Sequence, residues 1–149
     1  MFNIVLIQPE IPTNTGNIGR LSLASGCNLH LVKPLGFDLS ESRVKRAGLD
    51  YWKHVPLTIY EDTDAFFSEH KDKEMSFLSS HGKKNYCDIN FTEDMYLIFG
   101  KESVGLPKII TDNNSDNLFQ IPIFSSHVRS LNLANAVGIV VYEGIRQIK

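Results

Sequence analysis

Polar and glycine residues that could carry chemistry are concentrated in three predicted loops, at residues 9–17, 100–107 and 121–132. Each loop follows a short apolar run of the kind that predicts a buried strand. Asn14 lies in the first loop and Arg20 follows it on the next predicted helix. Arginine presents a planar fork of N–H donors that suits phosphate. Because ligands of parallel sheets bind beyond the carboxyl ends of the strands, these three loops are the predicted site.

The second loop places a carboxylate between two glycines. Gly100 and Gly105 bracket Glu102, and glycine lets a backbone approach a ligand closely or adopt a positive φ. Three interpretations of Glu102 stay open: an exposed carboxylate, an ion-pair partner of Arg20 or Arg129, or a residue that orients a bound ligand.

The third loop leads into the last predicted helix through Ser130 and Asn132. Serine and asparagine are both favoured at helix N-caps, and a capping role is compatible with ligand binding. Asn14 and Arg20 also have ordinary interpretations, as a loop-capping amide and a solvated cation. Residue type alone therefore does not separate structural from functional roles here.

Alternating strand and helix patterns predict an α/β fold with a parallel sheet covered on both faces. Strands are predicted at residues 2–8, 28–34, 55–60, 75–80, 95–100 and 117–124. Helices are predicted at 18–26, 40–52, 64–71, 105–111 and 130–147, and residues 85–91 are ambiguous. Gly26 suits the C-cap of the first helix, and Asp62 or Thr63 could cap the third.

Length and charge narrow the class of protein. The chain has 149 residues, which fits one domain at 1–149, and its net charge is −2. The pI near 6.2 argues against a general nucleic-acid binder, but not against a local basic patch. The densest basic cluster is either a solvated helix face or a contact to an RNA backbone, and it comprises Arg43, Lys45 and Arg46.

The N-terminal run and the cysteines indicate a cytoplasmic protein. The opening apolar run is too short to span a bilayer and lacks the features of a signal peptide. Cys27 and Cys87 form no CxxC pair and have no histidine at metal-ligand spacing. We interpret them as reduced, partly buried thiols, and we expect no metal site.

Common nucleotide-binding and nucleophile motifs are missing from the sequence. No GxGxxG follows the first strand, and the segment FGKES lacks the earlier glycine and the Ser or Thr of a phosphate-binding loop. No GxSxG elbow is present. Ser125 and His127 are close in sequence, but proximity in sequence does not make a catalytic triad.

Three segments, taken in order, resemble the signature motifs of the SPOUT superfamily of RNA methyltransferases. They are PEIPTNTGNIGR at 9–20, FGKESVGLP at 99–107 and IPIFSSHVRSLNLANAVGIVVYE at 121–143. With RAGLDYW at 46–52, they are most similar to the compact branch called TrmL or YibK. The members of that branch are tRNA 2′-O-methyltransferases that act on the wobble pyrimidine. The resemblance covers nearly the whole chain.

The resemblance implies a parallel sheet with a trefoil knot, a homodimer, S-adenosylmethionine bound in the knot, an anticodon stem-loop as substrate, and no metal. The implied catalytic residues are Asn14, Arg20, Ser130 and Asn132. The implied cofactor-binding residues, which act largely through backbone groups, are Leu78, Gly100, Glu102, Ile121 and Ser130. The implied RNA-binding residues are Arg43, Lys45, Arg46, Arg129 and Tyr142.

The implied reaction is methyl transfer from S-adenosylmethionine to the ribose 2′-hydroxyl of tRNA nucleotide 34, a cytidine or modified uridine, as in tRNA-Leu. Because guanidinium is effectively always protonated, Arg20 is better suited to hold phosphate and stabilise a developing alkoxide than to act as a base. Two alternatives stay open: the same methylation at another tRNA or rRNA site, and a noncatalytic RNA-binding dimer that keeps the cofactor pocket.

Two departures from the family pattern bear on substrate choice. Val104 stands where relatives often carry Arg or Lys, and the stretch Ser125–Val128 replaces a shorter polar stretch.

Overall fold

The computed structural model describes residues 1–40 and 49–149. The predicted RNA contacts Arg43, Lys45 and Arg46, and most of the helix predicted at 40–52, therefore lie outside the described residues. The strands are β1 (Asn3–Ile7), β2 (Asn28–Val32), β3 (Leu57–Tyr60), β4 (Met75–Leu78), β5 (Lys84–Asn85), β6 (Tyr96–Phe99) and β7 (Leu118–Gln120). The α-helices are α1 (Pro12–Ser25), α3 (Thr63–Glu69), α4 (Lys108–Asn113) and α5 (Leu133–Ile148). Short 3-10 helices cover Leu49–His54, Tyr86–Asp88 and Ser115–Asn117.

The strands of the described chain form one seven-stranded sheet in the order β3-β2-β1-β6-β4-β7-β5. Each neighbouring pair in it is parallel. Chain order runs outward from β1 through β2 to β3, and β4 then starts on the other side of β1. The order reverses between β1 and β6, which are paired neighbours. The loops beyond β1 and β6 therefore meet at a switch point, where open α/β sheets bind ligands.

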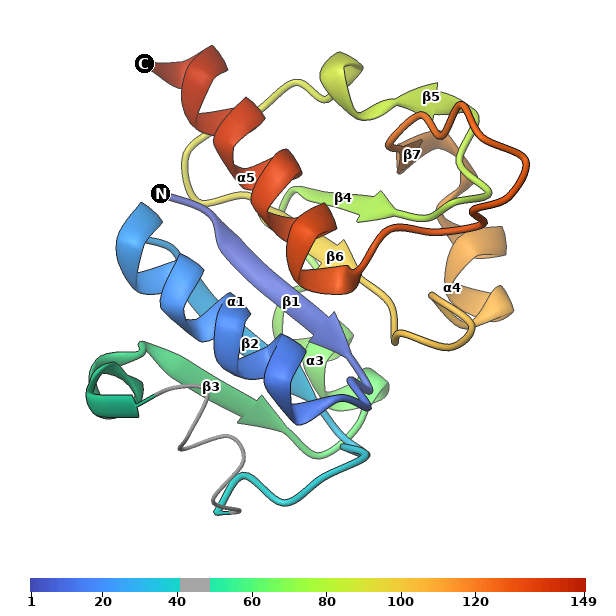
Figure 1. The fold of residues 1–149 in the computed structure, drawn as a ribbon. Helices are drawn as coiled ribbons and strands as arrows, with labels where there is room; N and C mark the ends of the chain where they lie inside the picture. Colours follow the sequence, from blue (N-terminus) through green and yellow to red (C-terminus); the bar gives the residue numbers. More distant parts are fainter. Residues whose placement is uncertain (41–48) are drawn as a thin grey trace.

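Helices cover both faces of the sheet, as the alternating pattern predicted. Helices α1 and α5 lie side by side on one face, and α3 and α4 lie on the other (Figure 1). Ile4 and Leu6 of β1 pack beneath α1 and α5, whereas Val5 and Ile7 pack toward α3 and α4. All four side chains are fully buried. Each contributes roughly 1.5–3 kcal/mol through burial, which explains the continuous apolar run.

Local sequence signals correctly predicted two helix ends. Gly26 ends α1 at φ 73°, and its backbone N–H donates to Leu23. Asp62 caps α3 by accepting a hydrogen bond from the backbone N–H of Ala65 at 2.7 Å. In both cases the capping group lies next to the helix in sequence.

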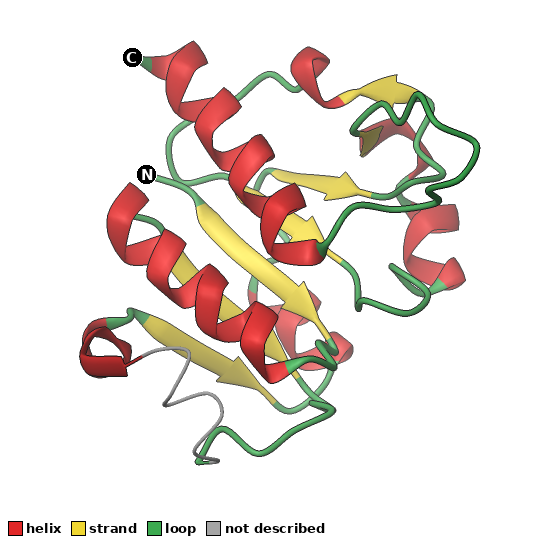
Figure 2. Cartoon of the chain, in the orientation of Figure 1, coloured by secondary structure: helices red, strands yellow, loops and turns green. Residues whose placement is uncertain are grey.

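Three predicted boundaries were wrong. Helix α1 begins at Pro12, so most of the loop predicted at 9–17 is helical. Strand β7 ends at Gln120, and residues 121–132 form an irregular segment rather than the end of a strand (Figure 2). Helix α5 begins at Leu133, with Asn132 rather than Ser130 as its N-cap. The prediction of partly buried thiols was also wrong, because Cys27 is buried and Cys87 is exposed.

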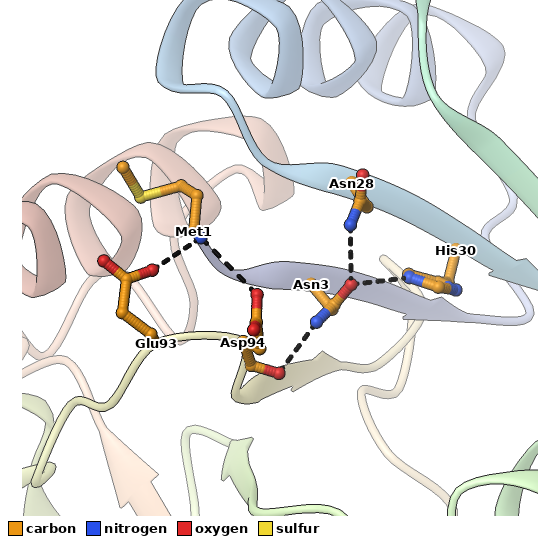
Figure 3. A network of polar contacts seen from close by, with 6 residues as sticks. All are labelled: Met1, Asn3, Asn28, His30, Glu93 and Asp94. Atoms are coloured by element: carbon orange, nitrogen blue, oxygen red, sulfur yellow. Dashed lines mark hydrogen bonds and ion pairs between the residues drawn. The ribbon is translucent and has the colours of Figure 1, made fainter.

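A polar network ties the start of β1 to neighbouring segments (Figure 3). The amino group of Met1 donates to Glu93 at 2.6 Å, and this contact raises the pKa of the amino group. The Asn3 amide nitrogen donates to the backbone oxygen of Asp94 at 2.8 Å. The Asn3 side-chain oxygen therefore faces Asn28, whose amide nitrogen donates to it at 3.0 Å. Asn3 is a buried polar residue with its hydrogen-bonding groups satisfied.

The same oxygen of Asn3 begins a buried chain of hydrogen bonds through two histidines. It lies 3.1 Å from Nε2 of His30, whose Nδ1 lies 3.0 Å from the hydroxyl of Tyr60. That hydroxyl lies 2.9 Å from Nε2 of His70. Burial, with the nearby His70, lowers the pKa of His30 to about 4. His30 is therefore neutral at pH 7, donating from Nε2 and accepting from Tyr60 at Nδ1, so His70 donates to Tyr60.

Among the helices of residues 1–40 and 49–149, none has the length and apolar character needed to cross a membrane.

Candidate active site

Three of the five positions predicted to bind the cofactor lie at the carboxyl ends of three adjacent strands. Leu78 ends β4 and is in register with Phe99 on β6 and Phe119 on β7. Gly100 follows β6 directly, and Ile121 follows β7 directly. The structure therefore brings Leu78, Gly100 and Ile121 to one edge of the sheet, as expected for residues that share a ligand.

The backbone that follows β7 makes almost no hydrogen bonds within the described fold. Within the described chain, residues 121–131 make no backbone–backbone hydrogen bond, and the one backbone bond to a side chain joins the His127 N–H to the Ser125 hydroxyl. Backbone N–H and C=O groups are strong hydrogen-bonding groups that are paired in most folded segments. This segment begins beside the apolar side chains of Leu78 and Ile121. An apolar wall beside available backbone groups suits a heteroaromatic ligand.

Gly100 and Gly105 are required by the loop that carries Glu102. A Cβ on Gly100 would lie 2.1 Å from the backbone carbon of Gly105, so only glycine fits where the loop closes on itself. Gly105 has φ 73°, and its N–H donates to the carbonyl of Lys101 at 2.9 Å. The close approach predicted for Gly100 is therefore at least partly an approach to its own loop.

Glu102 binds the start of α1 rather than an arginine. Its carboxylate accepts hydrogen bonds from the backbone N–H groups of Glu10 at 2.7 Å and Ile11 at 3.0 Å. It also accepts from the amide nitrogen of Asn14 at 3.3 Å. Ile11 is the N-cap residue of α1 and makes no side-chain cap of its own. A carboxylate from another loop thus takes the place of a local cap, where the helix dipole favours negative charge.

Asn14 continues this contact to the third loop. Its side-chain oxygen accepts from the amide nitrogen of Asn132 at 3.0 Å. The Asn132 oxygen in turn accepts from the backbone N–H groups of Ala134 at 2.9 Å and Asn135 at 3.3 Å, which caps α5. We call this chain, from Glu102 through Asn14 and Asn132 to the start of α5, the amide relay. It joins all three loops that were predicted to form the site.

The groups at the two ends of the amide relay fix the orientation of both side-chain amides. An ionised carboxylate can only accept, so Asn14 must turn its NH₂ group toward Glu102. Backbone N–H groups can only donate, so Asn132 must turn its oxygen toward α5. The remaining Asn14 oxygen and Asn132 nitrogen then face each other as acceptor and donor. The hydrogen bonds of the relay can therefore all form in only one orientation of the two amides.

A second contact between the same loops involves two residues that sequence reasoning missed. The Glu10 carboxylate accepts hydrogen bonds from the Ser103 backbone N–H at 3.0 Å and from its hydroxyl at 2.6 Å. Both bonds lower the pKa of Glu10. Because Glu10 also donates its backbone N–H to Glu102, the two loops are linked in both directions. Glu10 lies within the first motif, but nothing in its spacing indicates a partner at Ser103.

Arg20 stands apart from the amide relay. It is exposed, and its guanidinium carbon lies 5.7 Å from the centre of the Tyr51 ring. Arg20 is six residues after Asn14, which on an α-helix corresponds to a net rotation of about 240° and a rise of about 9 Å. The two side chains therefore point from different sides of α1. The structure therefore does not bring Arg20 to Glu102. Tyr51, which holds Arg20 by a cation–π contact, was not predicted as a site residue.

The remaining predicted residues are at the surface. Ser130 and Arg129 are exposed in the irregular segment before α5. Arg129 makes no ion pair in the described chain, so of the interpretations left open for Glu102 the pairing with Arg20 or Arg129 is excluded. Tyr142 is 51% exposed on α5, with Ile139 exposed nearby on the same helix. Within the described residues, no group of three or more His, Cys, Asp or Glu side chains could hold a metal ion.

Comparisons with known proteins identify the family of the chain. Residues 1–142 match the model of the SpoU rRNA Methylase family. A tRNA (cytidine(34)-2′-O)-methyltransferase of Saccharophagus degradans is 44% identical over 149 residues, covering 99% of this chain and 96% of that protein. A solved structure described as giving structural insights into the 2-OH methylation of C/U34 on tRNA matches with a TM-score of 0.94 at 44% identity, covering 99% and 96% of the two chains.

A more distant structure carries the cofactor. An AdoMet-bound rRNA methyltransferase from Sinorhizobium meliloti matches with a TM-score of 0.88 at 25% identity, covering 99% of this chain and 57% of that one. Fold and comparisons together define an α/β methyltransferase with a parallel sheet. The chain belongs to the SpoU rRNA methylase family, which confirms the family and fold class that the three motifs predicted. The trefoil knot itself stays a prediction.

Proposed function

We propose that the protein transfers a methyl group from S-adenosylmethionine to the ribose 2′-oxygen of nucleotide 34 of tRNA. Relatives that match over nearly the whole chain support the substrate. The observation on this chain that carries the proposal is the amide relay, because it locks the three motif loops together at the carboxyl edge of the sheet.

Residues at this edge fit the proposed cofactor. Leu78 and Ile121 offer apolar walls for an adenine, and the unpaired backbone that follows Ile121 offers hydrogen bonds to its edge. Gly100 and Ser130 complete the predicted set, and Glu102 acts by holding the relay. When bound, S-adenosylmethionine supplies an electrophilic methyl carbon and a neutral thioether leaving group. In this in-line displacement the methyl carbon leaves the sulfur as it bonds to the 2′-oxygen, and the hydroxyl proton is released to water. The step needs no metal ion.

The residues of the chain then have to position the acceptor ribose. Asn14, Asn132 and Ser130 lie where the first and third loops meet, and they hold the acceptor at near-attack distance from the methyl carbon. Arg20 is oriented by Tyr51 and stands apart from these residues within one chain. It therefore acts at an RNA site shared across the two subunits of the proposed homodimer, where it holds a phosphate of the substrate and stabilises the charge that develops on the 2′-oxygen. Arg129, Tyr142 and the basic cluster Arg43, Lys45 and Arg46 contact the anticodon stem-loop. Their phosphate contacts reconcile an acidic pI with an RNA substrate.

The proposal treats residues 1–149 as one catalytic domain that acts in the cytoplasm as a homodimer. The exposed aliphatic side chain of Ile139 on α5, at 38%, supports a partner on that helix. Sedimentation equilibrium of the purified protein tests the dimer.

Two rival functions are separated by one pair of measurements. Calorimetry with S-adenosylmethionine measures cofactor binding, and transfer of labelled methyl to total tRNA or to rRNA measures catalysis. We expect micromolar binding and label in tRNA. Label confined to rRNA would support the same chemistry on another substrate, and binding without transfer to either RNA would support a noncatalytic dimer.

A further inference from the structure

Phe124 is the most exposed large hydrophobic side chain in the described residues. It is 98% exposed, whereas Val104 and Ile109 come next at 70%. Single exposed aliphatic side chains are common on protein surfaces and need no explanation. A phenylalanine with almost its whole surface in water is a larger departure, because aromatic rings bury 150–250 Å² each when they have a partner.

The segment that carries Phe124 is connected to the site at both of its ends. It lies three residues after Ile121, at the carboxyl edge of the sheet, and its segment ends at Asn132 in the amide relay. A chain spans at most about 3.6 Å per residue, so the Cα of Phe124 is within about 11 Å of the Cα of Ile121. Phe124 therefore lies near the carboxyl edge of the sheet, where the proposed site is built.

The segment that carries the ring is of mixed polarity and has no acidic side chain. Residues 121–132 contain no Asp or Glu, and their exposed side chains include Ser125, His127 and Arg129. Val128, at 47%, and Leu131, at 37%, are exposed aliphatic side chains of the same segment. A second copy of the chain would be expected to meet a continuous apolar patch, and a cofactor ring would be enclosed by neighbouring protein atoms. Along the segment, Ser125, Ser126 and His127 separate Phe124 from the exposed aliphatic side chains that follow, so the sequence around the ring is mixed rather than continuously apolar.

Single-stranded RNA presents the complementary chemistry. Its unstacked bases stack on aromatic side chains while arginine contacts the adjacent phosphate. We infer that Phe124 is a stacking platform for a nucleobase of the RNA substrate, at or next to the methylated nucleotide, with Arg129 on the neighbouring phosphate. This inference rests on the proposed function and adds a specificity residue that the family motifs do not mark.

Variants of Phe124 test this role against matched controls. Loss of one base–aromatic stack weakens binding roughly 5- to 150-fold, so Phe124→Ala should raise the Kd for an anticodon stem-loop by that factor. Phe124→Tyr keeps a ring and should restore affinity to within about threefold. Ile109→Ala removes an equally apolar, 70% exposed side chain from α4 and should leave RNA binding unchanged.

The dependence of the RNA Kd on salt concentration separates a stacking contact from a phosphate contact. Phe124→Ala should leave the slope of log Kd against log salt unchanged, whereas Arg129→Ala should reduce it by about 0.7, the value for one phosphate contact on a single strand. The Kd for S-adenosylmethionine, the sedimentation coefficient and the unfolding midpoint of Phe124→Ala should match the wild type.

Three outcomes would overturn the inference: unchanged RNA affinity, a larger loss for S-adenosylmethionine than for RNA, or a shift in oligomeric state. If the wild-type protein itself binds no RNA, the proposed function fails rather than this assignment alone.

Discussion

Replacing Asn132 by aspartate tests the amide relay with a change of one atom. The side-chain oxygen that caps α5 is kept, because Asp and Asn are equally favoured N-caps. The N–H group that donates to Asn14 across 3.0 Å is replaced by an acceptor oxygen. Asn14 cannot turn its amide over in response, because its nitrogen is held by the Glu102 carboxylate at 3.3 Å.

The expected loss follows from the hydrogen bonds involved. One side-chain hydrogen bond contributes about 0.5–1.5 kcal/mol, so Asn132→Asp should lower the free energy of unfolding by about 1 kcal/mol. Asn132→Ala also removes the cap, worth about 1 kcal/mol, and should cost about 2 kcal/mol. For a chain of this length each kcal/mol lowers the unfolding midpoint by about 2–4 °C. Both variants therefore stay folded at 25 °C.

The effect on catalysis should exceed the effect on stability. The relay fixes the spacing between the loop of Asn14 and the segment of Ser130, and a misplacement of about 1 Å can cost about 100-fold in rate. We expect Asn132→Asp to slow single-turnover methyl transfer by about that factor.

Urea unfolding and single-turnover kinetics measure the two effects. A double-mutant cycle of Asn14→Ala and Asn132→Ala should give a coupling energy of about 0.5–1.5 kcal/mol. Wild-type unfolding energy and wild-type transfer rate in Asn132→Asp, together with zero coupling in the cycle, would show that the relay has no role.

Three further predictions follow from single contacts. Gly100→Ala should cost at least about 1–3 kcal/mol in unfolding free energy, because the new Cβ would lie 2.1 Å from the backbone of Gly105. Gly105→Asn, where the side chain enters open space at φ 73°, should cost under about 1 kcal/mol. Equal costs of the two variants in urea unfolding would contradict this. Arg20→Ala should lower kcat by about 10²–10³ while the calorimetric Kd for S-adenosylmethionine stays unchanged; near-normal turnover would remove Arg20 from catalysis. The pKa of His30 falls from 6.5 to about 4 on folding. Because the unfolded state then binds the proton at a higher pH than the folded state, the free energy of unfolding should fall by about 3 kcal/mol as the pH drops from 6.5 to 4. His30→Gln should abolish this loss in unfolding measured across that range, and an unchanged pH profile would place the titration elsewhere.

Features that depend on neighbours in sequence were predictable. The apolar run of β1, the C-cap Gly26 and the N-cap Asp62 each follow from residues within a few positions of the element. The edge of the sheet that carries Leu78 and Gly100 also followed, because parallel strands place their carboxyl ends together.

Features that depend on distant residues were not predictable from pattern. The start of α1 at Pro12 was missed because its cap comes from Glu102, about ninety positions away in the chain. Asn14 and Asn132 are separated by 118 positions, and no periodicity connects them. The pairing of Glu102 with arginine was a reasonable expectation from charge, but the backbone N–H groups at the helix start offered partners at 2.7 and 3.0 Å. The parallel-sheet rule placed the three loops in one site, and the family resemblance assigned roles to Asn14, Glu102 and Asn132 within them.

The position of the transferred methyl group tests the central claim most directly. The protein is incubated with methyl-labelled S-adenosylmethionine and tRNA from a strain that lacks this activity, and the tRNA is digested and analysed by mass spectrometry. The account predicts one additional methyl group, on the ribose of nucleotide 34, with transfer strongly slowed in Asn132→Asp. A methyl group on a base, on another nucleotide, or in no tRNA would contradict it.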